Sequence, residues 1–451
     1  MTPLLLTLLA CGGADRRVVV LGVDGLEWSM VDRLIEDGEL PHFQQLIDQG
    51  VRGSVASTTP VMSPIIWTSI ASGYPGEVHG IAGWTTGRGH GYDASDVRVM
   101  RLWDVATARG QESLVVGWLM TFPASPIQGR VISDRFVWSF PMNKDPDDPS
   151  LLVDRRQHEQ LVGLVSPPSL EARAATWMPD EDWLAAHPLA YQVDAYGSPF
   201  HPLRRDELHI RAFEALWPES DARVGLVYIN GPDQVSHIYW PYADPDAAAQ
   251  MRRDPQEHFR QINAERAAGG GHRAAPYADA PITPAQIAEG ARFVPDYYRT
   301  VDDMLGRVLD VVDLETTTLL VCSDHGFRVP PVHPLANGGH SRRAATLWVG
   351  RDVDPDATIP EDATVLDLGP TLFALAGLPG AADWPGQPLT GLFDGLTLPP
   401  PVDSYRLTDR AELAVELGTQ ANPQLMEQLE ALGYVDGEGR PILGASRSPM
   451  R

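Results

Sequence analysis

Positive charge, cysteine and long apolar runs are all scarce in this chain of 451 residues. Lys144 is the only lysine, and 35 Lys and Arg residues stand against 60 Asp and Glu residues, so the formal net charge is −25. Surfaces that bind nucleic acid are rich in Lys and Arg, and this balance argues against a nucleic-acid polymer as partner. An anionic ligand must instead be held locally, by metal ions or by clustered arginines.

The two cysteines, Cys11 and Cys322, lie in such different contexts that no disulfide framework is expected. Cys322 stands in an apolar run typical of a buried strand, where a cysteine is usually inert. Cys11 follows the apolar residues 4–10, which are too few to span a bilayer and lie where an export signal belongs.

The sequence Leu8-Leu9-Ala10-Cys11 resembles the lipobox of bacterial lipoproteins, in which the cysteine carries the lipid. We therefore expect an exported protein anchored in the bacterial cell envelope through Cys11, with a periplasmic or secreted protein as the alternative. No other segment is long and apolar enough to cross a membrane, so membrane contact is expected through the lipid anchor only.

Apolar runs at residues 18–23, 113–119, 224–230 and 317–323 are typical of buried strands, and each precedes a polar loop. Residues 28–50 have helical spacing that breaks at Pro41. This alternation predicts an α/β fold with a doubly wound, mostly parallel central sheet flanked by helices. Ligands of such sheets bind beyond the carboxyl ends of the strands, where Asp24 and the loops after Asn230 and Ser323 should converge.

Two segments interrupt the alternation and are predicted to be cap insertions over the site. Further helices are expected at residues 364–377 and 425–432. The sequence leaves the oligomeric state open. The expected division is a leader and linker at 1–17, a catalytic core at 18–140, 216–240 and 291–393, cap insertions at 141–215 and 241–290, and a C-terminal extension at 394–451.

Ser63 lies in the most informative stretch of the chain, residues 58–73. Pro64 fits the first position of a helix that runs to Ser72, which would make Ser63 the N-cap. At the positive end of a helix, backbone N–H groups can hold an anionic oxygen and a metal can lower the pKa of the hydroxyl. Taken alone, the motif favours capping without any chemistry.

Asp233 and His237 stand four residues apart directly after a predicted strand. They can bind one metal ion if that loop begins a helical turn. The adjacent Asp324 and His325 would point to opposite faces of a regular strand, so both reach one site only if the chain turns, as Gly326 permits.

A third histidine, His340, follows two glycines and so has a flexible backbone. His333 is its rival, because it also lies after the Asp324 strand. The three aspartates and three histidines, each beyond a strand or in a glycine loop, are more than a fold needs.

In this order, the motifs resemble the alkaline phosphatase superfamily in its type I phosphodiesterase and nucleotide pyrophosphatase branch. No single motif is specific, but their order along most of the chain is. They are residues 18–25, 63–81, Leu102-Trp103, 118–123, 233–237, 323–326, Gly339-His340, 365–371 and 432–434.

The resemblance implies two divalent metal ions about 3.5 to 4 Å apart and a phosphoseryl intermediate on Ser63. A mixed Asp and His ligand set suits zinc, with manganese or iron as substitutes. The implied substrate is a small phosphorylated molecule, and two in-line displacements would retain the configuration at phosphorus. One ion would be held by Asp24, Asp324, His325 and the Ser63 hydroxyl, and the other by Asp233, His237 and His340.

One position departs from the family pattern. Nucleotide pyrophosphatases of this branch carry an asparagine, which helps bind a phosphate oxygen, where this chain has Trp84. That oxygen then needs another donor. The candidates are the Trp84 indole N–H, Arg88, Arg328 and Arg342.

Related reactions remain alternatives: a phosphomonoesterase, a phosphonate hydrolase, a phosphoglycerate mutase or a head-group transferase would share the metal frame. Sulfatases of the superfamily need a Cys/Ser-x-Pro-x-Arg motif, which residues 63–67 lack. A different class of alternative is a surface lipoprotein that binds a partner while its site is silent, and the full set of six ligand candidates argues against it.

Overall fold

A computed structural model describes residues 16–84, 91–137, 163–190, 202–267 and 280–407. In these residues eight strands form one sheet in the order β2-β10-β7-β1-β6-β3-β4-β5. All pairings from β7 to β4 are parallel, whereas β10 runs antiparallel to β2 and β7, and β5 antiparallel to β4. The strands are β1 (Arg17–Val23), β2 (Val51–Ala56), β3 (Ser113–Val116), β4 (Gly129–Ile132), β5 (Val165–Ser166), β6 (Val224–Ile229), β7 (Thr317–Cys322) and β10 (Arg343–Gly350).

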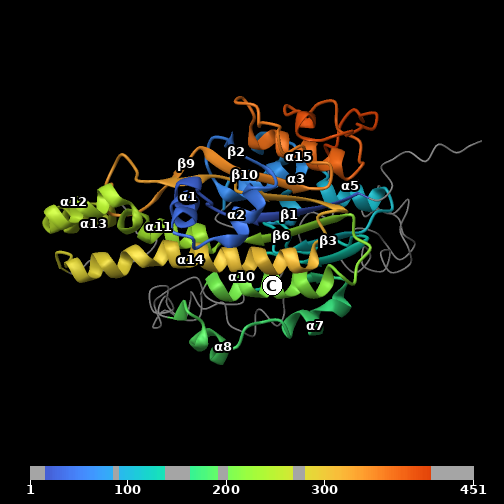
Figure 1. The fold of residues 1–451 in the computed structure, drawn as a ribbon. Helices are drawn as coiled ribbons and strands as arrows, with labels where there is room; N and C mark the ends of the chain where they lie inside the picture. Colours follow the sequence, from blue (N-terminus) through green and yellow to red (C-terminus); the bar gives the residue numbers. More distant parts are fainter. Residues whose placement is uncertain (1–15, 85–90, 138–162, 191–201, 268–279, 408–451) are drawn as a thin grey trace, which may run out of the picture.

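The predicted α/β fold with a mostly parallel sheet is confirmed. Strand β1 shows why: Val19 and Leu21 join one hydrophobic core, while Val18 and Val20 join the other. A strand buried on both faces reads as a continuous apolar run, as this one does. Figure 1 shows α3, α5 and α15 on one side of the sheet and α10 and α14 on the other.

The helices cover both faces of the sheet. Residues 28–50 form two helices that part before Pro41, as their spacing predicts. The longer helices are α1 (Trp28–Glu36), α2 (Pro41–Ile47), α3 (Ser63–Ser72), α5 (Leu102–Ala108), α10 (Pro202–Leu216), α11 (Gly231–Ala243), α12 (Pro245–Arg253), α13 (Pro255–Ala267), α14 (Pro284–Val311) and α15 (Val365–Leu375). The shorter ones are α4 (Gly76–His79), α7 (Glu171–Ala175) and α8 (Glu181–Ala186).

Two predictions from the sequence, the helix at 425–432 and the lipidated Cys11, concern residues outside the described ones. Cys322 is buried in β7 with a free thiol. In the described part of the chain, no helix combines the length and apolar character that a membrane span requires.

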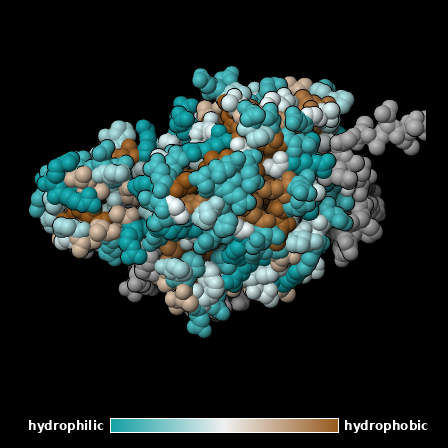
Figure 2. All heavy atoms as spheres, in the orientation of Figure 1, coloured by the Kyte–Doolittle hydropathy of each residue, from teal (hydrophilic) through white to brown (hydrophobic). Residues whose placement is uncertain are grey.

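The two predicted cap segments contain helices with different surroundings. Helix α10, within 141–215, packs against β3, β6 and α14 in the layer below the sheet. Helices α12 and α13, within 241–290, form an arm that projects from the body (Figure 1). Figure 2 shows a mostly hydrophilic surface on this side, with apolar side chains in separate patches.

Helix α3 is held in place by α15, and the two helices meet at a glycine. A Cβ atom on Gly369 of α15 would lie 2.7 Å from the backbone nitrogen of Gly73 and 3.0 Å from the carbonyl oxygen of Ile70. Both atoms are backbone at the end of α3, so neither can move away as a side chain would. The close approach fixes α3 against the sheet.

Gly369→Ala should therefore destabilise the fold by about 1–3 kcal/mol, because the added methyl group separates the two helices. Chemical denaturation measures this change. Gly391→Ala is the matched control, since a Cβ there meets no atom within 4 Å, and its effect should stay within about 0.5 kcal/mol. Equal stability of the two variants would contradict this account of the contact.

Candidate active site

Helix α3 begins at Ser63, one residue earlier than the sequence predicted, and its N-cap is Met62. The amides of the first turn bond to the carbonyl of Met62. The Ser63 hydroxyl is buried and points away from its own helix, 3.4 Å from Oδ1 of Asp24 and 3.4 Å from Nε2 of His325. Capping therefore does not explain this side chain.

Asp24 follows β1 directly, and its two oxygens have different surroundings. Oδ2 accepts hydrogen bonds from the Tyr228 hydroxyl at 2.5 Å, the Trp67 indole at 3.2 Å and the Asn230 amide at 3.5 Å. Oδ1 faces the Ser63 hydroxyl. Three donors thus occupy one oxygen and leave the other for the site.

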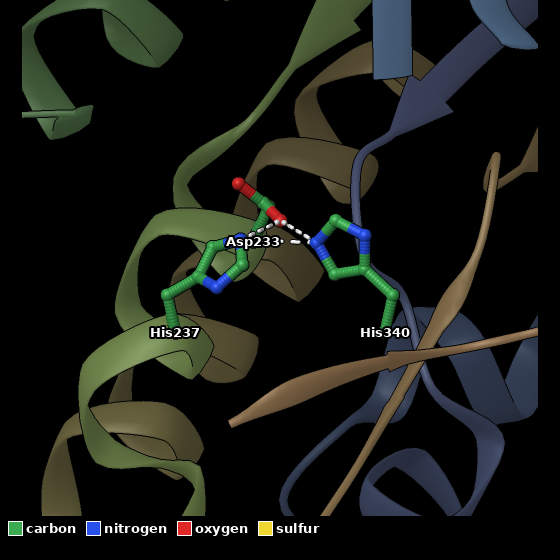
Figure 3. A group of neighbouring side chains, drawn as sticks. All are labelled: Asp233, His237 and His340. Atoms are coloured by element: carbon green, nitrogen blue, oxygen red, sulfur yellow. Dashed lines mark hydrogen bonds and ion pairs between the residues drawn. The ribbon is translucent and has the colours of Figure 1, made fainter. Parts of the chain in front are cut away.

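Asp233 and His237 lie one turn apart at the start of α11, the helical turn that their spacing required. Oδ1 of Asp233 is 3.2 Å from Nε2 of His237 and 3.4 Å from Nε2 of His340. The two Nε2 atoms are 3.0 Å apart. In Figure 3 the two imidazoles face each other across the carboxylate, His340 coming from the short strand β9 (Gly339–Ser341).

Asp324 and His325 are brought to the same place because the chain turns after β7 into the short strand β8 (Gly326–Arg328). Nε2 of His325 lies 3.4 Å from Oδ2 of Asp324 and 3.8 Å from Oδ1 of Asp233. Its ring stacks on that of His340 with the centroids 3.6 Å apart. All six ligand candidates therefore converge beside Ser63.

The ligand atoms form two groups, and within each the atoms lie within 4.8 Å of one another. One group is Asp233, His237 and His340, as the resemblance implies. The other is Asp24, Asp233 and His325, so Asp233 belongs to both groups while Asp324 stands beside His325.

Burial and mutual repulsion set the protonation of the carboxyl groups. Burial, with the Asp233 charge, raises the pKa of Asp24 to about 6. Burial and the charge of Asp24 raise the pKa of Asp324 well above its usual range. Burial alone would also raise the pKa of Asp233, but the nearby imidazoles outweigh it and hold that pKa well below the usual value.

The side chains fit divalent cations. Nδ1 of His340 lies 3.1 Å from the Val61 carbonyl oxygen, and Nδ1 of His325 lies 3.2 Å from that of Gly326. A proton on each Nδ1 makes these hydrogen bonds and directs the lone pair of Nε2 into the site, as in metal-ligating histidines. Among the described residues, no donor forms a hydrogen bond with the buried Oδ1 of Asp233 or Oδ2 of Asp324. These nitrogen and oxygen atoms are the ligands that zinc prefers.

His340, rather than His333, reaches the site. His333 lies in the loop between β8 and β9, near Glu257 of α13. Helix α13 also holds that loop: the Gln261 side chain accepts from the Leu335 amide at 2.8 Å. Sequence reasoning missed this contact, because α13 carries no chemical motif.

The substrate-binding candidates are exposed side chains or lie outside the described residues. Arg328 is exposed, and its Nε donates to the His340 carbonyl at 3.3 Å. Arg342 is exposed and donates to the Ser57 carbonyl at 3.4 Å. Trp84 is 40% exposed. Arg88 lies outside the described residues.

The sequence profile of the type I phosphodiesterase / nucleotide pyrophosphatase family matches residues 18–332, which include all the converging side chains except His340. The chain belongs to this family. As a type I phosphodiesterase / nucleotide pyrophosphatase family member, it is a hydrolase of phosphoric esters. No curated protein gives a significant match by sequence.

Solved structures are similar to this chain at low sequence identity. A putative sulfatase from Bacteroides thetaiotaomicron is 13% identical, with 83% of this chain and 74% of that chain covered and a TM-score of 0.50. A 2-O GAG sulfatase is 12% identical, with coverage of 84% and 74% and a TM-score of 0.51. Murine ectonucleotide pyrophosphatase / phosphodiesterase 5 is 13% identical, with coverage of 80% and 95% and a TM-score of 0.44.

Divalent ions should stabilise this family member, because they offset the repulsion among three buried carboxylates. Protein purified without chelator should carry about two ions, and chelation should lower its melting temperature. His237→Ala should reduce the metal content to about one ion, as measured by elemental analysis.

His42→Ala is the control for metal content, since that imidazole pairs with Asp302 instead, and its metal content should match the wild type. A melting temperature that chelation leaves unchanged would contradict a metal site here.

Proposed function

We propose that this family member hydrolyses small phosphodiesters with Ser63 as nucleophile and two divalent metal ions, zinc first and manganese or iron as substitutes. The observation that carries the proposal is the placement of the Ser63 hydroxyl. It is buried, it does not cap its helix, and it faces Asp24 and His325 at 3.4 Å. Ser72 of the same helix, by contrast, donates to the backbone carbonyl of Thr68.

The metal ligands of the proposal follow the resemblance and are supported by the convergence of their atoms. When bound, the ions would lower the pKa of the serine hydroxyl and stabilise charge on the departing oxygen. Asp24, Asp324 and His325 would hold the ion next to Ser63, and Asp233, His237 and His340 the other. Because Oδ1 of Asp233 is close to both groups, this carboxylate also suits a position between them.

In the first step Oγ of Ser63 attacks phosphorus, and the bond from phosphorus to the ester oxygen breaks. The serine proton passes to solvent, because the atoms of Asp24 and His325 that face the hydroxyl would hold the ion, and the departing alcohol gains a proton from water. In the second step water attacks the phosphoserine, the bond from phosphorus to Oγ breaks, and Ser63 recovers its proton.

Phosphate oxygens of the substrate would be bound by groups at the edge of the site. Arg328 and Arg342 are the described candidates with a charge. Arg328 donates to the backbone carbonyl of His340, and Arg342 donates to that of Ser57 in the loop before α3. Trp84 offers an indole N–H and an exposed ring. Arg88 is proposed from its place in the sequence alone, as a substitute for the asparagine that Trp84 replaces.

Ser63→Ala should leave folding and metal content nearly intact and remove most turnover of a chromogenic diester such as bis-p-nitrophenyl phosphate, because it deletes the attacking group. Initial rates in zinc and in manganese measure the effect. Trapping of a phosphorylated Ser63 peptide at low pH would be the positive sign.

Ser72→Ala provides the control on the same helix, because the Ser72 hydroxyl bonds to the carbonyl of Thr68. Its turnover should equal that of the wild type. Wild-type rates in Ser63→Ala would exclude the covalent route through this residue.

We also propose that the protein is exported and anchored through a lipid on Cys11. The support is the lipobox-like sequence that ends at this residue. Cys11→Ala should abolish incorporation of labelled fatty acid and release the protein from washed membranes. Labelling that persists in Cys11→Ala would refute the anchor and leave the hydrolase proposal intact.

A further inference from the structure

A buried arginine contacts the residue before α11, and it lies in a segment that we predicted from the sequence to be part of a cap. Arg205 is on α10 and only 5% exposed. Its Nη2 donates to Oδ1 of Asn230, the residue between β6 and α11. A buried guanidinium keeps its charge and needs fixed partners, so this contact is expected to be specific.

The contact determines which way the Asn230 amide faces. Oδ1 of Asn230 accepts from Arg205 and from Nε2 of Gln234 at 2.8 Å. The NH₂ group must therefore point to the other side, where it donates to the Tyr228 hydroxyl at 3.0 Å and to Oδ2 of Asp24 at 3.5 Å. A reversed amide would place its oxygen against the Asp24 carboxylate.

Tyr228 completes the link. Its hydroxyl receives the hydrogen bond from Asn230 and donates its own proton to Oδ2 of Asp24 at 2.5 Å. Since a hydroxyl has one proton, the Asn230 donor directs that proton towards Asp24. The chain of contacts thus runs from Arg205 through Asn230 and Tyr228 to Oδ2 of Asp24.

The neighbouring Asp206 holds the backbone at the same point. Its two oxygens accept from the amides of Asn230 and Gly231 at 3.1 and 2.8 Å, and from the Tyr297 hydroxyl at 2.8 Å. Helix α10 therefore fixes both the Asn230 side chain, through Arg205, and the start of α11, which carries Asp233.

We propose that Arg205 is a positioning residue for the reaction. By fixing the Asn230 amide, it keeps Oδ2 of Asp24 on its donors and leaves Oδ1 facing Ser63 and the metal site. The role of Oδ1 rests on the proposed function, whereas the link to Asp24 rests on the contacts alone.

The test compares Arg205→Met with Arg307→Met. Arg307 forms ion pairs with Glu207 and Glu214, which are on α10 as well, but has no contact with Asn230 among the described residues. Metal binding to the chelator-stripped protein is measured by calorimetry with zinc and with manganese, and turnover of bis-p-nitrophenyl phosphate by initial rates.

Arg205→Met should weaken metal affinity or lower kcat by about 10- to 100-fold, the range typical of residues that orient metal ligands, with a smaller change in KM. Guanidinium ion should restore part of the loss, and sodium chloride of equal concentration should not. Arg307→Met should keep wild-type metal affinity even if its melting temperature falls. Wild-type affinity and kcat in folded Arg205→Met would overturn the proposal.

Should Arg205→Met fail to fold, Asn230→Ala tests the same link, because it removes the amide and leaves Arg205 in place. The same loss of metal affinity is expected, and unchanged affinity and kcat would overturn the proposal. Inactivity of the wild type, or full activity of Ser63→Ala, would instead contradict the proposed function. In that event the comparison of metal affinity between the wild type and Arg205→Met still tests whether Arg205 positions Asp24.

Discussion

The repulsion among Asp24, Asp233 and Asp324 is the constraint around which the site is built. All three carboxyl groups are buried. Burial and the charge of Asp233 raise the pKa of Asp24, and burial and the charge of Asp24 raise the pKa of Asp324. Buried like charges are costly unless cations or hydrogen-bond donors compensate them. The imidazoles around Asp233 and the three donors on Oδ2 of Asp24 supply part of that compensation. Divalent cations would supply the rest.

The parallel order of the central strands brings these side chains together. β7, β1 and β6 are parallel neighbours, so the residues after them emerge at the same edge of the sheet. Packing between helices and loops then determines where the side chains lie. Helix α15 packs closely against α3 at Gly369, and α13 accepts a hydrogen bond from the loop that leads to His340. Elements that carry no chemistry thus decide the distances between those that do.

The net negative charge of the chain means that the site must also overcome repulsion of an anionic substrate. A net charge of −25 repels an anionic substrate at long range. Bound cations would reverse the potential locally, and the exposed Arg328 and Arg342 lie beside His340 and the loop before Ser63. Attraction confined to this part of the surface would suit the small phosphorylated molecule that we propose as substrate.

Much of this protein was readable in the sequence. The apolar run at 18–23 predicted a strand buried on both faces. The polar residues that follow this run and the runs at 224–230 and 317–323 predicted that Asp24, Asp233 and Asp324 lie close together. These signals are local, because a strand and its next few residues are encoded together. Asp233 and His237 needed only a helical turn, which α11 provides.

Other features depended on contacts between distant segments. Ser63 looked like a helix cap, and only the positions of Asp24 and His325 showed that its hydroxyl faces elsewhere. Arg205 lies in a stretch without clear periodicity, so nothing local marked it as a partner of Asn230. The sequence determined which residues stand at the strand ends, because that information is carried by neighbouring residues. Only the tertiary structure decided which oxygen of Asp24 faces Ser63, because that choice is made by Tyr228 of β6, Trp67 of α3 and Asn230 before α11, which meet only once the sheet is packed.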